Sequence, residues 1–109
     1  MTTITNASGK EYKIPSATEL KRAAAHARRL ESKFPEYSGL HIDVYYDLES
    51  GEFRFHELSQ NSFIDTHEHP EMFYLAHKDF SDPTGRLSLT EDEYAAAMHE
   101  WIANYIQTL

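Results

Sequence analysis

The chain has 109 residues, with 18 Asp and Glu against 10 Lys and Arg, and no cysteine. This length suits one domain with its own core, and the lack of cysteine excludes disulfides, thiol nucleophiles and thiolate metal ligands. We therefore expect a single domain over residues 1–109. No apolar stretch approaches the roughly 20 residues of a membrane helix, and no signal-peptide pattern opens the chain. These two observations lead us to expect a protein that works in the cytoplasm of its producer or of a host cell.

Two short segments rich in β-branched and aromatic residues open the sequence. Thr2–Thr5 and Glu11–Ile14 are separated by a stretch from Asn6 to Gly9 that contains the turn formers Asn, Ser and Gly. This arrangement predicts a β-hairpin.

A helix is predicted to follow, because Ser16 and Glu19 have the spacing of a capping box. We expect it to run to about Phe34, where Pro35 stops it. Its apolar stripe is predicted to face the core and consists of Leu20, Ala23, Ala27, Leu30 and Phe34. A second stripe, which we call the basic stripe, consists of Arg22, His26, Arg29 and Lys33.

The next segment alternates between apolar and polar residues, which predicts a half-buried strand over Leu40–Leu48. Glu49 to Gly51 form the expected turn, and Glu52–Leu58 is the predicted return strand of a hairpin. In the return strand, Phe53 and Phe55 should point inward, toward the core. Arg54 and His56 should point outward.

Two further strands are predicted over Ser62–Thr66 and Glu71–His77, around a loop from His67 to Pro70. Ser81 to Gly85 should form an exposed loop.

Thr90 and Glu93 then have the spacing of a second helix cap. The last helix carries a wide apolar face, expected to be buried, that consists of Tyr94, Met98, Trp101, Ile102, Tyr105, Ile106 and Leu109. We therefore predict an α+β fold: an N-terminal β-hairpin, a helix, an antiparallel sheet of two to four strands and a C-terminal amphipathic helix, with both helices on one face of the sheet.

Charge is unevenly distributed along the chain. Residues 1–35 hold seven Lys and Arg against three Asp and Glu, a net of +4, whereas residues 36–109 hold three against fifteen, a net of −12. Such an acidic block keeps a domain soluble, but it also repels nucleic acid and attracts basic proteins, many of which handle nucleic acid.

The candidate partner-binding surface is the polar side of the main hairpin. Alternation places Asp43, Tyr45 and Asp47 on the side away from the core, together with His41 and His56, and the turn adds Glu49 and Glu52. The alternatives are that this is an ordinary solvated sheet face, and that the basic stripe of the first helix makes the interface.

A pair of histidines is the sharpest chemical feature of the sequence. His67 and His69 lie two residues apart, with Asp65 and Glu71 as nearby carboxylates, a spacing that suits a divalent metal ion. The string from Phe63 to Glu71, which contains Asp-Thr-His-Glu-His, resembles the Asp-Thr-His-x-His opening of amidohydrolases and related metal-dependent hydrolases. That resemblance covers about nine residues, and the barrel of those enzymes needs roughly 200 or more residues. We therefore predict no metal and no cofactor, and a metal-binding protein or hydrolase remains an alternative.

Nucleophilic catalysis finds no support, because the chain has no cysteine, no Gly-x-Ser-x-Gly string and no glycine-rich loop. We predict that the protein is not an enzyme and has no catalytic residues.

In size, charge and the opening segment from Thr3 to Tyr12, the chain resembles small acidic anti-defence proteins of phages and plasmids, including anti-CRISPR proteins. The resemblance implies a cytoplasmic nucleic acid mimic that inhibits a basic nucleic-acid-binding protein or nuclease complex, without binding nucleic acid or membrane itself. An immunity protein that neutralises a nuclease toxin is the alternative of the same kind, and a homodimer is possible.

Overall fold

The computed structural model describes residues 1–33, 42–57, 64–82 and 86–109. Phe34, Leu40, His41 and Leu58, which the sequence placed in predicted helices and strands, lie outside these residues. In chain order the elements are β1 (Thr2–Thr5), β2 (Glu11–Ile14), α1 (Ala17–Ser32), β3 (Ile42–Asp47), β4 (Glu52–Glu57), β5 (Met72–Leu75) and α2 (Glu91–Gln107).

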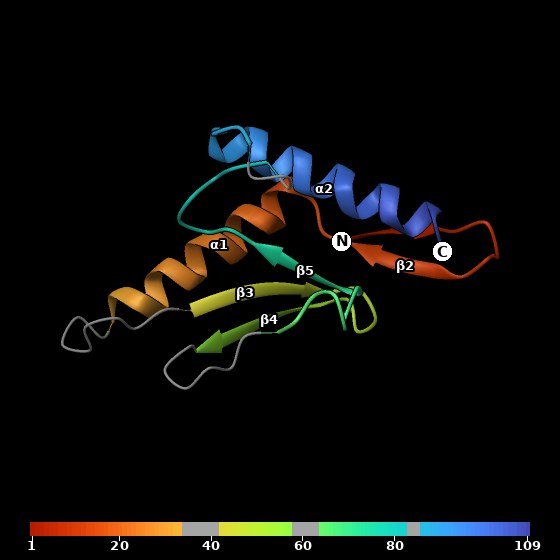
Figure 1. Ribbon diagram of the computed structural model, residues 1–109, viewed down its shortest axis with the longest axis horizontal. Helices are drawn as coiled ribbons and strands as arrows, with labels where there is room; N and C mark the ends of the chain where they lie inside the picture. Colours follow the sequence, from red (N-terminus) through yellow and green to blue (C-terminus); the bar gives the residue numbers. More distant parts are fainter. Residues whose placement is uncertain (34–41, 58–63, 83–85) are drawn as a thin grey trace.

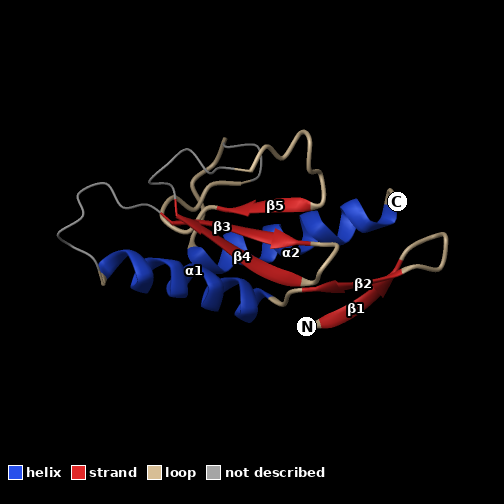
Figure 2. Cartoon of the chain, turned by 90° about the horizontal axis from the view of Figure 1, so that it is seen from below, coloured by secondary structure: helices blue, strands red, loops and turns tan. Residues whose placement is uncertain are grey.

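The strands form two antiparallel sheets, one of β1 and β2 and one in the order β4-β3-β5. Both helices pack against the same face of the three-stranded sheet (Figures 1 and 2), and we call the opposite face the far face. The β1–β2 hairpin lies beside the C-terminal end of α2, where the Asn6 side-chain amide donates to the carbonyl oxygen of Leu109 over 3.3 Å. The predicted α+β class, with its N-terminal hairpin and C-terminal helix, is confirmed.

Each helix begins at the residue that the sequence indicated. The Ser16 hydroxyl accepts from the Glu19 amide and the Glu19 side chain accepts from the Ser16 amide, which completes a capping box. Thr90 and Glu93 repeat the arrangement at α2. Because each box satisfies two backbone donors that the helix itself leaves free, these local signals are enough to define where the helices start.

The core lies between the sheet and the two helices. Val44 and Tyr46 of β3 are completely buried, and register places Leu75 and Phe73 of β5 directly beside them on the same face. The side of α1 that meets them is made of small residues, Ala23, Ala24 and Ala27, around Leu20. Alanine lets the helix approach the sheet closely, so the large strand side chains supply most of the volume.

Two predictions about the elements are wrong. Ile64 to Thr66 do not belong to a strand, although Ser62–Thr66 was expected to form one, and residues 62 and 63 lie outside the described part of the chain. The face of α2 is also buried only in part: Tyr94, Met98, Ile102 and Ile106 are in the core, whereas Trp101 and Leu109 are 38% and 42% exposed. The sheet beneath α2 ends at β5, so it covers a narrower stripe of the helix than the apolar pattern suggested.

Candidate functional site

Three of the five predicted partner-binding residues are buried. Asp43, Tyr45 and Asp47 point to the far face, as strand alternation requires, but they are only 6%, 3% and 6% exposed. The expectation that they form a solvated face is therefore wrong. β3 is the central strand, so neighbours on β4 and β5 flank these side chains from both sides.

Tyr45 is enclosed by aromatic rings and by the segment that precedes β5. Its ring centroid lies 5.8 Å from that of His56 and 5.6 Å from that of Tyr74. Its hydroxyl donates to Asp43 Oδ2 over 3.3 Å and accepts from the Ile64 amide over 3.2 Å. Burial, reinforced by the Asp43 carboxylate, raises the pKa of the Tyr45 phenol. The phenol therefore stays protonated at neutral pH and acts as a hydrogen-bond donor.

Asp47 stabilises the turn between β3 and β4. Its Oδ1 accepts from the amides of Glu49 and Ser50 over 3.0 and 3.4 Å, and its Oδ2 accepts from Arg54 Nη2 over 3.2 Å. Burial opposes ionisation, but the hydrogen bonds from Ser50, Arg54 and Glu49 outweigh it and lower the pKa of the carboxyl group. Gly51 closes the turn with a φ of +71°, a conformation that glycine adopts at little cost. The Asp47 carboxylate is thus occupied within the fold.

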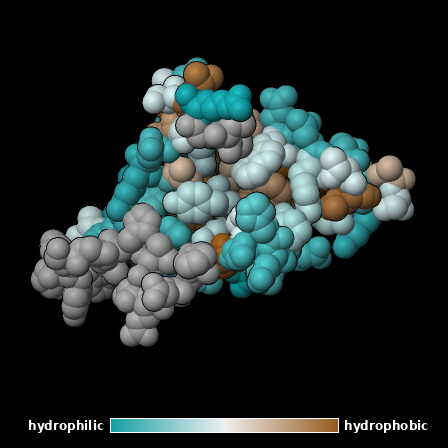
Figure 3. Space-filling model, viewed as in Figure 1, coloured by the Kyte–Doolittle hydropathy of each residue, from teal (hydrophilic) through white to brown (hydrophobic). Residues whose placement is uncertain are grey.

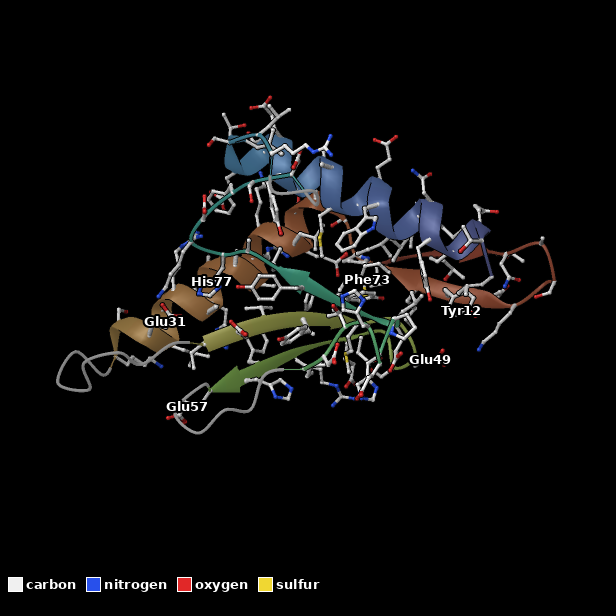
Figure 4. All side chains as sticks on the ribbon, in the orientation of Figure 1. Tyr12, Glu31, Glu49, Glu57, Phe73 and His77 are labelled. Atoms are coloured by element: carbon white, nitrogen blue, oxygen red, sulfur yellow. The ribbon has the colours of Figure 1, made fainter. Side chains whose placement is uncertain are left out.

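Glu49 and Glu52, the other two predicted residues, are exposed at one end of the sheet. The Leu48 amide donates to the Glu71 carbonyl oxygen over 2.9 Å, which holds the β3–β4 turn against the segment that leads into β5. The segments joined by this contact carry five carboxylates that we call the acidic end: Glu49, Glu52, Asp65, Glu68 and Glu71. Figure 4 shows Glu49 at this end of the hairpin and Glu57 at the other, and hydrophilic side chains gather over the same region in Figure 3.

Most of the acidic end is open to solvent. Glu49 is 3.8 Å from Lys10 Nζ, a weak contact between two exposed side chains. Within the described part of the chain, Glu52 and Glu68 make no ion pair. The result is a concentration of negative charge held by two turns rather than by a strand face.

His67 and His69 lie in the second of these turns, and both side chains are exposed. The Asp65 carboxylate accepts from the His67 amide over 2.9 Å, and the Asp65 carbonyl oxygen accepts from the His69 amide over 2.9 Å. His69 Nδ1 is 3.4 Å from Glu71 Oε1. Among the residues that the structure describes, no three His, Asp or Glu side chains are placed to hold one metal ion.

The basic stripe is exposed along α1, as predicted, and three of its residues border a hollow between α1 and β4. Arg22, His26 and Arg29 line one side of this open hollow of about 490 Å³, and Phe53 and Phe55 line the other. The sequence placed the two phenylalanines inward, and they do face α1. Because β4 is at the edge of the sheet, they are covered only partly, and Phe55 is 37% exposed.

A further polar cluster joins the end of α1 to the sheet. Glu31 Oε1 accepts from the Ile42 amide and lies within 2.8 Å of His77 Nε2, while its Oε2 lies 2.8 Å from Lys78 Nζ. His77 is almost completely buried, and Figure 4 shows it directly beside Glu31. No pattern in the sequence indicated this cluster. One signal was available: an acid near a helix C-terminus is disfavoured by the helix dipole, so Glu31 needs partners from elsewhere in the chain.

Comparison with known proteins gives no relative. No family model, no curated protein and no solved structure matches this chain. None of the helices in the described residues is long and apolar enough to cross a membrane.

Proposed function

We propose that this protein is a non-enzymatic inhibitor of the anti-defence type, which binds a basic nucleic-acid-handling protein through its acidic end. The observation that carries the proposal is the set of exposed carboxylates at the end of the sheet, of which Glu52 and Glu68 have no ion-pair partner within the described residues. Carboxylates gathered in this way offer negative charge where a basic protein would otherwise bind phosphate.

The proposed interface differs from the surface that the sequence indicated. Glu49 and Glu52 remain in it, whereas Asp43, Tyr45 and Asp47 support it from within. Asp47 contributes by fixing the turn that presents Glu49 and Glu52. Exposed charges at the border of an interface, such as those of Glu49 and Glu52, act mainly on the association rate and on its dependence on salt. They do so because they attract the partner before the two surfaces touch.

The test compares two triple variants with the same change in net charge. Glu49→Gln, Glu52→Gln and Glu68→Gln remove charge from the acidic end, whereas Glu11→Gln, Asp79→Asn and Glu100→Gln remove it from exposed positions elsewhere. Each tagged protein captures partners from a host lysate at low and at high salt. Captured proteins are quantified by mass spectrometry, and the purified partner is assayed for inhibition.

We expect the wild type and the control variant to retain a basic nucleic-acid-handling protein at low salt and to inhibit it. The variant of the acidic end should lose at least tenfold in affinity. Equal loss in the control variant would contradict the assignment of the surface. Capture restricted to metabolic enzymes, or substrate turnover by the chain alone, would contradict the function.

A further inference from the structure

Arg22 and Arg29 of α1 have no ion-pair partner among the described residues, although acids outnumber bases in this chain. Lys21, Arg28 and Arg54 each lie within 3.3 Å of a carboxylate oxygen. Within the described residues, by contrast, Arg22 and Arg29 contact no carboxylate. They border the hollow between α1 and β4 with His26 between them. Glu19 also borders the hollow, but its Oε1 lies 3.0 Å from the ammonium group of Met1, which balances its charge. The hollow therefore has a surplus of positive charge.

The opposite wall of the hollow is aromatic. The ring of Phe55 meets that of His26 edge to face, with centroids 5.0 Å apart, and Phe53 packs on Tyr46 with centroids 5.4 Å apart. These contacts fix the two phenylalanine rings and cover them only in part, so apolar surface remains available next to the arginines. A ligand for this hollow would combine negative charge with apolar groups.

The strand that carries both phenylalanines is an edge strand. β4 pairs with β3 on one side, and in the described part of the chain no strand pairs with its other side. An open strand edge presents backbone donors and acceptors that a further strand can satisfy. Addition of an extended peptide to such an edge is a common mode of recognition, in which alternate side chains enter the neighbouring groove.

We propose that an extended acidic peptide adds to the outer edge of β4, the edge opposite β3, and sends its carboxylates toward Arg22 and Arg29. The two arginines are seven residues apart on α1, so their Cα atoms are about 10 Å apart along the helix. Carboxylates at positions i and i+2 of a strand are about 7 Å apart, which two long arginine side chains can reach. Apolar residues at the next positions on the same face of the peptide, i−2 or i+4, would cover Phe53 and Phe55.

A peptide fits these features better than a single-stranded nucleic acid, although cationic grooves with aromatic rings also bind single strands. Only a peptide can use the backbone edge of β4. A long polyanion would also meet the general repulsion of a chain with a net charge of −8. This site adjoins the acidic end at Glu52, the first residue of β4, but its test changes other residues and does not require the partner proposed there.

The test selects ligands from a displayed library of random linear peptides against three forms of the protein. The forms are the wild type, the charge reversal Arg22→Glu with Arg29→Glu, and a control reversal, Lys13→Glu with Arg86→Glu, at exposed positions outside the hollow. The best selected peptide is then synthesised, its affinity is measured by fluorescence polarisation, and hydrogen exchange is followed in the complex. A 12-nucleotide oligothymidylate is titrated in parallel.

We expect wild type and control to select peptides with Asp or Glu at alternate positions, and the Arg22 and Arg29 reversal to weaken the chosen peptide at least tenfold. Backbone amides of β4 should gain protection from exchange. The proposal would be overturned if the selected peptides are not enriched in Asp and Glu. It would also be overturned if the chosen peptide binds the wild type and the Arg22 and Arg29 reversal equally well. Tighter binding of the oligonucleotide, with perturbation of the same residues, would assign the hollow to nucleic acid instead. A concentration-dependent dimer that the Arg22 and Arg29 reversal abolishes would assign it to a second copy of the chain.

Discussion

Glu31 connects three parts of the chain through one carboxylate. It receives the first amide of β3, the buried His77 and the ammonium group of Lys78, and so ties the end of α1 to the start of β3 and to the segment after β5. Burial disfavours the charged form, but the hydrogen bonds from Lys78, Ile42 and His77 outweigh it. They lower the pKa of Glu31 from its ordinary value of 4.5 to about 2.

This shift predicts a pH-dependent contribution to stability. Because the pKa is lower in the folded state, the stabilisation is complete above pH 4.5 and is lost as the pH falls toward 2. A shift of this size corresponds to on the order of 3 kcal/mol at neutral pH. Glu31→Gln should therefore lower the free energy of unfolding at pH 7 by up to that amount, and by far less near pH 2.5, where the wild-type carboxyl group is also partly neutral.

Urea denaturation of both proteins at pH 7, 4.5 and 2.5 measures the difference. Glu100→Gln, at an exposed position of α2, is the control and should change little at any pH. A loss of stability in Glu31→Gln that stays constant over this range would show that the residue acts by packing rather than by its charge.

At the scale of the elements, position in the sheet decides how far each strand is buried. β3 and β4 have comparable alternating sequences, yet every described residue of β3 is buried, whereas β4 is largely exposed. The central strand has neighbours on both sides and a helix on one face, and the edge strand lacks one neighbour. A similar effect limits α2, where the stripe over the sheet is buried and the flanking apolar residues are not.

The burial of α2 leads to a prediction for two apolar residues of the same predicted face. Ile102 is completely buried, whereas Leu109 at the end of the chain is 42% exposed. Ile102→Ala should lower the free energy of unfolding by about 3 kcal/mol, because it leaves a cavity in the core. Leu109→Ala should cost less than about 1 kcal/mol, because its surroundings can relax into solvent. Chemical denaturation followed by circular dichroism measures both, and comparable losses would mean that the residues after α2 are packed as tightly as the middle of the helix.

In the molecule as a whole, the basic stripe and the acidic end lie on either side of the start of β4. The basic stripe follows α1 beside β4, and the acidic end is formed by the turns before and after the strands at one end of the sheet. The His67 and His69 pair belongs to the acidic end, where negative charge would also favour a cation. A metal ion bound by the histidines would therefore also be attracted by the carboxylates of the acidic end.

We expect His67 and His69 to be dispensable. A stable metal site usually needs three or four protein ligands. Of the four candidate side chains in this turn, only those of His69 and Glu71 lie within ion-pair distance of each other. His67→Gln with His69→Gln should leave the melting temperature and the inhibition unchanged, and a chelator should not alter the melting temperature of the wild type. A fall of several degrees on adding the chelator would reveal a bound metal ion, since a ligand that binds only the native state must stabilise it.

Elements with local signals could be predicted from the sequence alone. The cap residues Ser16 and Thr90, the glycine turn at Gly51 and the alternation of the hairpin each act within a few residues, so the α+β class and most boundaries could be predicted. Alternation also gave the face on which Asp43 and Asp47 lie. It could not give their burial, because burial depends on which strands become neighbours and on the segment around Ile64. Only the tertiary structure decided that Asp47 supports a turn, that Glu31 receives three distant donors, and that the open edge of β4 lies beside the arginines of α1. These features arise from contacts between residues far apart in the chain, whose pairing no local pattern encodes.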